Sequence, residues 1–275
     1  MRKDRVMLAQ IKKGMFVLSL IIVLTGCSSK KDNLFTQGFD AIFIAPMQWL
    51  LGLFSSWFGG QFGFGIILLV LLVRFCMLPF MIRQSKVSHR IRQIKPVVMP
   101  QLNQAKEVVK ATQVPEEKRQ AQKQLMQLYQ QYGMHPYQTM LGCLPMLLQF
   151  PILLGLLYAI KHPSEHILMT EMQFLGFDLR HPTVVLTCLA GLLYCIQPLV
   201  NMGNFERKRF TIVLAILMPL FIMFAATQTP SAIALYWITN ASFLIVQMTL
   251  TNLIFRKRAQ KEAKALERQF SRKDK

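Results

Sequence analysis

A few polar side chains stand inside long apolar stretches of this 275-residue sequence, and their types and spacing are the ones that could do chemistry. Arg74, in the run LLVRFCMLPF, is the charged member. The uncharged members are Gln149, Gln197, Tyr236, Asn240, Gln247 and Thr251. The last four are spaced by 4, 7 and 4 positions, which would place them on one face of a helix. Such residues could line a polar cavity around Arg74, or they could simply hydrogen-bond between helices.

The sequence gives little support for an enzyme active site or a metal-binding site. His162-Pro163-Ser164-Glu165-His166 matches the H-x-x-E-H zinc pattern, but that chemistry needs both histidines on one helix face and a third ligand. Here a proline follows the first histidine, in a short segment between apolar stretches. The sequence also has no Gly-rich phosphate loop and no plausible Ser/His/Asp arrangement. We therefore predict no enzyme activity, no metal site and no cofactor.

The composition indicates which kind of molecule must position these residues. Hydrophobic residues make up 53% and charged ones 16%, with a net charge of +19, and the mean hydropathy is +0.34. Soluble domains carry about 25% charged residues, and a disordered polycation would be poor in large apolar residues. The remaining class is an integral membrane protein. Its 13 acids avoid residues 41–106, 118–164, 179–205 and 207–261, which contain every long apolar segment.

The amino terminus is predicted to be a lipoprotein signal peptide, residues 1–26. Five basic residues precede an apolar run over residues 15–24, which is too short to span a membrane comfortably. Leu24-Thr25-Gly26-Cys27 looks like a bacterial lipobox, in which the Cys27 thiolate accepts a diacylglyceryl group. The alternative is an uncleaved anchor helix with a chance cysteine at its end. On the lipobox interpretation, the covalent lipid on Cys27 is the one attached group.

Five further stretches are long enough to cross about 30 Å of hydrocarbon at about 1.5 Å per residue. Whether residues 41–58 form a sixth span is decided by the positive-inside rule. With five spans after an external Cys27, 22 Lys/Arg lie on the cytoplasmic side and four outside. A sixth span would invert this distribution. We therefore predict an all-α polytopic membrane protein with five transmembrane helices, a cytoplasmic helical hairpin and an external interfacial helix.

The predicted segments follow in chain order. A lipidated tether and external amphipathic helix occupy residues 27–59, including Trp49 and Trp57. In the cytoplasmic hairpin, Pro96 and Pro100 should bend or break the first half. The second helix should begin at Pro115 and end near Tyr132, before Gly133 and Pro136. The remaining segments are transmembrane helix 1 (60–82), the hairpin (83–136), transmembrane helix 2 (138–160), an external loop (161–181), transmembrane helix 3 (182–200), a cytoplasmic loop (201–209), transmembrane helix 4 (210–227), transmembrane helix 5 (231–255) and a basic tail (256–275).

The depth of Arg74 favours the cavity over simple snorkelling. It stands nine residues before Arg83, about 13 Å along a helix from the basic boundary. Snorkelling would cover about half that distance. A charge so deep costs about 2.5 kcal/mol or more unless it faces water or a partner, and the predicted spans contain no acid. We therefore expect Arg74 to face a polar cavity that is open to the cytoplasm.

The tail has two candidate partners. Residues 256–275 carry nine basic and three acidic residues with helical spacing. Anionic lipid attracts each basic residue near its surface by about 1 kcal/mol, and ribosomal RNA would also attract such a tail. The sequence leaves both alternatives open.

Three separated motifs together resemble the YidC-type membrane protein insertases, the Oxa/Alb/YidC family. Pro230-Ser231-Ala232, with Leu235-Tyr236-Trp237 and Asn240, is similar to the last-helix motif of the family, and Arg74 followed by Leu78-Pro79 is similar to its first-helix arginine motif. The second-helix signature is Tyr129-Gln130-Gln131-Tyr132-Gly133, Pro136, Gly142-Cys143-Leu144-Pro145 and Gln149-Phe150-Pro151-Ile152. The likeness extends from about residue 35 to residue 256, and the short lipoprotein start resembles the Gram-positive branch. Departures are the five residues between Pro136 and Gly142, and Ala232 where glycine is frequent.

The resemblance implies an insertase of the bacterial plasma membrane, in which the five transmembrane helices surround a hydrophilic groove. This groove, with Arg74, Gln149, Gln197, Tyr236, Trp237, Asn240 and Gln247 as client-binding residues, would attract polar or acidic segments of nascent membrane proteins and release the client helix into lipid. Implied partners are these clients, the Sec translocon, anionic lipids and the ribosome through the tail. The main alternative is an anion or solute transporter with Arg74 as the substrate site, although the spans lack the carboxylates and histidines that proton-coupled carriers use. A lipid-modifying enzyme would need a catalytic group that we do not find.

Overall fold

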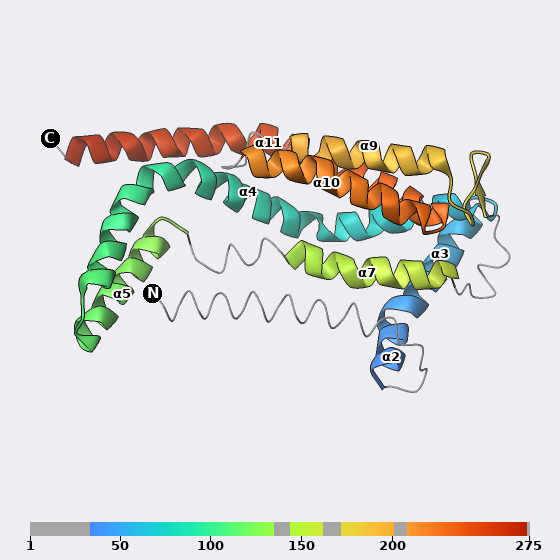
Figure 1. Ribbon diagram of the computed structural model, residues 1–275, viewed down its shortest axis with the longest axis horizontal. Helices are drawn as coiled ribbons and strands as arrows, with labels where there is room; N and C mark the ends of the chain where they lie inside the picture. Colours follow the sequence, from blue (N-terminus) through green and yellow to red (C-terminus); the bar gives the residue numbers. More distant parts are fainter. Residues whose placement is uncertain (1–33, 135–143, 162–171, 201–207, 274–275) are drawn as a thin grey trace. The chain divides into compact units, whose positions relative to one another are not determined.

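The computed structural model describes residues 34–134, 144–161, 172–200 and 208–273, which are mostly helical (Figure 1). By length and composition, three of its helices could cross a membrane, namely Gln37–Trp57, Phe62–Ala111 and Ser231–Arg272. Shorter apolar helices are Pro151–Ile160, Val184–Val200 and Ala215–Thr227. The protein is thus a polytopic helical membrane protein. The predicted signal peptide, Cys27, the start of transmembrane helix 2, the segment from His162 to His166 and most of the cytoplasmic loop lie outside the described residues.

The described chain forms two compact units, each considered by itself. Of the described residues, the first contains 34–41, 98–134 and 144–151, and the second contains 42–97, 152–161, 172–200 and 208–273. A short helix α2 (Leu34–Phe39) is followed by the π-helical turn η1 (Asp40–Ile44) and by α3 (Ala45–Trp57). In α3, Leu51 and Phe54 are buried whereas Trp49 and Trp57 are exposed. The helix therefore presents one apolar face to the protein and another, with its two tryptophans, to the surroundings.

Helix α4 (Phe62–Ala111) continues without interruption through Pro79, Pro96 and Pro100. Of the two outcomes predicted for Pro96 and Pro100, a bend or a break, the break does not occur. A proline inside a helix removes one backbone hydrogen bond and crowds the preceding turn. Packing of this stretch can offset that cost, because Ile94 and Val98 are fully buried.

The first unit contains the pairing of α4 with α5 (Pro115–Gln131), which begins at the proline where the sequence predicts the second helix of the hairpin. The Tyr132 hydroxyl donates a hydrogen bond to Gln101 Oε1 at 2.7 Å. The Lys106 ammonium lies 5.8 Å from the centre of the Tyr129 ring. Helix α5 ends in a left-handed Gly133 with φ of 61°, where Met134 N donates to the Tyr129 carbonyl at 2.8 Å. That is the glycine C-cap that the sequence suggests.

The second unit contains most of the apolar core. After α7 (Leu144–Lys161), it comprises the strands β1 (Gln173–Phe174) and β2 (Phe177–Asp178), then α9 (Val184–Val200), α10 (Lys208–Thr227) and α11 (Ser231–Lys273). Helix α9 packs against both α10 and α11 (Figure 1). The approach of α9 to α10 is close, since a Cβ on Gly191 would collide with the Met223 side chain. One continuous helix, α11, thus contains both the predicted last span and most of the basic tail.

A two-stranded antiparallel hairpin in residues 173–178 was not predicted from the sequence. Its register pairs Gln173 with Asp178 and Phe174 with Phe177, and the turn holds Leu175 at φ of 50° and Gly176 at 82°. Leucine is uncommon in a left-handed turn position, which normally favours glycine, asparagine or aspartate.

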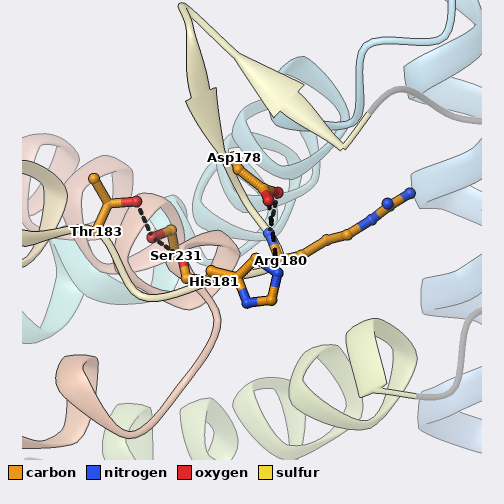
Figure 2. A network of polar contacts seen from close by, with 5 residues as sticks. All are labelled: Asp178, Arg180, His181, Thr183 and Ser231. Carbon is orange, nitrogen blue, oxygen red and sulfur yellow. Dashed lines mark hydrogen bonds and ion pairs between the residues drawn. The ribbon is translucent and has the colours of Figure 1, made fainter.

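The segment after this hairpin is fastened to the start of α11 (Figure 2). The Ser231 hydroxyl donates to the His181 carbonyl oxygen at 2.6 Å, and Ser231 Oγ is hydrogen-bonded with the Thr183 hydroxyl at 2.8 Å. The Ala232 amide donates to the Leu179 carbonyl oxygen at 3.1 Å. These bonds satisfy polar groups that a helix amino terminus would otherwise leave unpaired, and they join the segment before α9 to α11.

Candidate functional site

Arg74 is a buried charge on α4, with 4% of its surface exposed. It belongs to the apolar stretch of the helix, two turns after the fully buried Ile66. A guanidinium in such surroundings must find hydrogen-bond acceptors, because leaving its donors unsatisfied would be costly. Its surroundings therefore decide what it can do.

The principal acceptor is Asn240 on α11. Arg74 Nε donates to Asn240 Oδ1 at 2.7 Å, and Nη2 donates to the same oxygen. Nη1 lies 3.9 Å from Met81 Sδ, a weak acceptor on the same helix. The amide oxygen and the thioether carry no formal charge. The positive charge of Arg74 is therefore held by neutral acceptors in these contacts.

Tyr194 on α9 completes the cluster. Asn240 Nδ2 donates to the Tyr194 hydroxyl at 3.1 Å, which fixes the amide with its oxygen toward Arg74. The tyrosine was missed in the sequence, although it lies three positions before Gln197 and so shares a helix face with that predicted residue. Three helices, α4, α9 and α11, thus each contribute one side chain to the Arg74–Asn240–Tyr194 cluster.

The structure places the predicted face of α11 in the interior. Tyr236 is 3% exposed, Asn240 4%, Gln247 8% and Thr251 5%. Tyr236 precedes Asn240 by one helical turn and is an electrostatic neighbour of Arg74. Within the described part of the chain, the Gln247 Oε1 atom is buried and has no hydrogen-bond partner. Trp237, 7% exposed, belongs to the apolar core rather than to the polar cluster.

The two remaining predicted residues are half-buried. Gln197 lies on α9, the helix that packs against α11. Gln149 lies on α7 in the first compact unit, whereas the other six predicted site residues lie in the second. The structure therefore brings Arg74, Tyr236 and Asn240 together, and Gln149 belongs to a separately described part.

Arg74 can be buried to 4% exposure in this structure. The physical reason is that the Asn240 amide supplies the acceptor that water would supply in a cavity. No group of three or more His, Cys, Asp or Glu among the described residues could hold a metal ion. The arrangement can therefore present a positive charge to an anion or polar group that replaces the amide.

Comparison with known proteins now identifies the family. The family described as "60Kd inner membrane protein" matches residues 53–259, which include all three residues of the cluster. "Membrane protein insertase YidC 1" of Staphylococcus epidermidis is 38% identical over 263 residues, which cover 94% of each chain. The chain belongs to the YidC family of membrane protein insertases.

Other YidC relatives cover nearly as much of the chain. "Membrane protein insertase YidC" of Staphylococcus carnosus is 34% identical over 248 residues, 90% of this chain and 86% of its own length. The protein with the same name from Staphylococcus aureus strain JH9 is 36% identical over 252 residues, with 89% and 86% coverage. As a YidC family member, the chain is a multi-pass protein of a bacterial membrane, in agreement with its apolar helices.

Proposed function

We propose that this protein inserts and helps to fold integral membrane proteins, with Arg74 attracting a polar or acidic segment of the client. Family membership supports the insertase function. The observation that carries the role of Arg74 is its burial at 4% exposure against the neutral amide of Asn240. No covalent step is needed, because the protein would lower a barrier to transfer across the membrane.

The energetic argument is an exchange of acceptors. Moving a carboxylate into hydrocarbon is costly, and an opposite charge already inside a low-dielectric environment lowers that cost. A client carboxylate that displaces Asn240 Oδ1 from Arg74 replaces hydrogen bonds with one charged partner by an ion pair with two, and the low-dielectric surroundings strengthen that attraction. Asn240 would therefore hold Arg74 in place until a client arrives, and it would take the guanidinium back after release.

The proposed site extends beyond the cluster. Tyr236, Gln247 and Gln197 would form its polar wall on α11 and α9, and Trp237 would support α11 from the core. Gln149 would contribute from α7. Five spans would surround a hydrophilic groove that opens when a client enters, and apolar residues at its mouth would release the client helix sideways into lipid.

The proposed topology follows the distribution of charge. Cys27 would carry a covalent lipid outside the plasma membrane, and residues 27–59 would lie at the outer interface. The segment Gln37–Trp57 is long and apolar enough to span a membrane, but a sixth span would place the 22 basic residues outside. The hairpin 83–136 and the tail 256–275 would be cytoplasmic. Nascent membrane proteins would arrive alone or from the Sec translocon, and the tail would contact the ribosome or anionic lipid.

Reconstitution tests this function directly. Liposomes containing only this protein should insert a single-span client with an acidic translocated tail. Arg74→Ala should lower that insertion by about tenfold, corresponding to about 1.4 kcal/mol, whereas Arg74→Lys should retain most of it because the charge remains. A client with an uncharged tail is the control and should be affected less. Equal insertion of the acidic client by wild type and Arg74→Ala would contradict the role of the charge.

A further inference from the structure

A groove that is not lined by Arg74, Asn240 or Tyr194 lies in the same compact unit as these residues. It has a volume of about 890 Å³ and lies between α4, α9, α11 and the 173–178 hairpin. Helix α11 supplies much of the wall between Leu235 and Phe255, and α9 supplies Val185, Leu186 and Leu189. The α4 wall is a stripe at helical spacing, formed by Ile67, Leu71, Phe75, Leu78 and Ile82.

The lining of the groove is mainly hydrocarbon, and its four polar residues are Thr239, Ser242, Gln247 and Thr251. Thr239 Oγ1 donates to the Leu235 carbonyl oxygen at 2.9 Å. Thr251 Oγ1 donates to the Met248 carbonyl oxygen at 3.1 Å. Because both hydroxyls already donate to a carbonyl of their own helix, these two threonines do not need a polar ligand to satisfy them. The mainly apolar lining of the groove therefore favours a ligand with an aliphatic portion.

The volume of the groove indicates what kind of aliphatic ligand fits. A transmembrane helix with its side chains is about 10–12 Å wide and about 30 Å long, hence roughly 2900 Å³. A whole transmembrane helix is therefore larger than the groove. Acyl chains are much thinner and flexible, so they can enter a long, narrow groove between helices. Lipid chains thus fit it better than a client helix does.

The two ends of the groove differ in charge. Phe174, Leu175 and Phe177 of the hairpin line one end. At the other end, the lining residues Ile82 and Phe255 are followed directly in the chain by Arg83 and Arg256, both exposed.

Both arginines adjoin this end of the groove because each directly follows a lining residue, and α4 and α11 are close together just beyond it. Arg256 acts electrostatically on His89 of α4, and His89 in turn has a hydrogen bond with Asn252 of α11. Acids are scarce nearby in the sequence, since none occurs from residue 41 to 106. Glu262 of α11 is engaged with Arg90 at 2.8 Å. This end is therefore a cationic mouth that would suit a phosphate group.

We propose that the groove binds an anionic glycerophospholipid of the cytoplasmic leaflet. Its acyl chains lie along α4 and α11, and its phosphate binds at Arg83 and Arg256. The bound lipid stabilises the contact of α4 with α11, where the Phe75 and Phe243 rings meet edge to face at a centroid distance of 5.4 Å. The site shares Gln247 with the proposed client site but involves neither Arg74 nor Asn240, so lipid binding can be tested independently of client insertion.

Native mass spectrometry of the purified full-length protein tests the proposal, with phosphatidylglycerol and phosphatidylcholine of identical acyl chains as probes. Leu250→Trp fills the groove from a position that is 53% exposed, and Leu253→Trp is the matched control, 66% exposed on the same helix and outside the lining. We expect wild type and Leu253→Trp to retain phosphatidylglycerol, and Leu250→Trp to lose it. Arg83→Gln combined with Arg256→Gln should weaken its retention by about 30-fold, at about 1 kcal/mol per basic residue.

The outcomes separate the possible occupants. Equal phosphatidylglycerol retention by the two tryptophan variants would overturn the location of the site. Equal retention of both lipids by wild type would overturn the anionic headgroup. A photocrosslinker at position 250 that captures an inserting client instead of lipid would assign the groove to clients and overturn the proposal. If Leu250→Trp does not fold, Val246→Trp, at a lining position 59% exposed, replaces it.

Discussion

Arg74 meets an amide oxygen where a carboxylate would bind it more strongly. Asn240 satisfies the Nε and Nη2 donors without neutralising the charge, and Tyr194 orients that amide. A buried arginine paired with a carboxylate would be stable but electrostatically occupied. The neutral acceptor keeps the charge available to an anion that can displace it.

A second buried residue, His89, makes stability depend on pH. The side chain is 4% exposed. Burial, together with the positive charges of Arg92 and Arg256, holds the pKa of His89 below its usual 6.5, while its hydrogen bond with Asn252 acts in the opposite direction. In the unfolded chain the imidazole takes up a proton as the pH falls through about 6.5. The folded protein resists that proton, so the free energy of unfolding should decrease from about pH 6.5 downward, until the lowered pKa is reached.

Thermal unfolding in detergent at about pH 7.5 and about pH 5.5 measures this effect, because the interval spans the usual pKa of histidine. We expect His89→Gln to lose less stability than wild type between the two values. His181→Gln is the control, since the His181 side chain is 80% exposed, and it should behave like wild type. An equal loss in wild type and His89→Gln would show that other groups cause the pH dependence.

Sequence reasoning identified part of the site but not its internal bonding. The spacing of Tyr236, Asn240 and Gln247 is sufficient to place them on one helix face, because helical periodicity is local. The direct contact of Arg74 with Asn240 joins residues 166 positions apart, and no local pattern predicts such a pair. Tyr194 was missed for the same reason, since an aromatic residue in an apolar helix usually signals core packing.

Among the helices, α3 and α4 approach each other at a position where a side chain does not fit. A Cβ on Gly65 would collide with the Ser55 side chain and lie 3.0 Å from the Leu51 carbonyl oxygen. Ser55 and Leu51 are both fully buried. The small residue thus allows the two helix backbones to come close, as in other membrane helix pairs.

Gly65→Ala should therefore destabilise the protein despite the better helix propensity of alanine. Propensity favours alanine by about 1 kcal/mol, whereas overpacking costs about 1–3 kcal/mol. Gly38→Ala in α2 is the matched control, since its Cβ would meet no atom within 4 Å, and it should be neutral or stabilising. Thermal unfolding of the two variants checks this. A gain in stability for Gly65→Ala would mean that the approach is loose.

Helix boundaries could be predicted from the sequence where a proline, serine or glycine at the helix end determines them. Helix α5 begins at Pro115 and is followed by the left-handed Gly133, and α11 begins at Ser231. The continuity of α4 through Pro96 and Pro100 was not predictable, because tertiary burial overrides the local cost of proline. The 173–178 hairpin was missed as well, since Leu175 and Gly176 do not form a standard turn signal.

For the whole molecule, the basic tail is a continuation of α11 that packs against the protein. Ala259 and Ala263 are buried, and Glu262 pairs with Arg90 of α4. Lys257, Lys261, Lys264 and Arg268 are exposed. The tail therefore has one side that packs against the protein and an exposed basic side for a polyanion.

Deleting residues 256–275 should weaken ribosome co-sedimentation in a salt-dependent way. Changing Lys257, Lys261, Lys264 and Arg268 to Gln should do the same while leaving the packed side intact. The slope of log affinity against log salt should fall by about one for each phosphate that the variant no longer binds. Co-flotation with anionic vesicles is the parallel measurement. If the four-residue variant loses vesicle binding and keeps ribosome binding, lipid is the partner of the tail.

The central claim is that Arg74, held by the neutral amide of Asn240, draws an acidic client segment into the membrane, and Asn240→Asp tests it most directly. Aspartate preserves the size of the side chain but places a carboxylate against the guanidinium, so the folded protein should keep its thermal stability. The measurement is the ratio of acidic-tail to uncharged-tail client insertion in liposomes containing this protein alone. We predict that Asn240→Asp lowers this ratio to that of Arg74→Ala. A stably folded Asn240→Asp protein with the wild-type ratio would contradict the account.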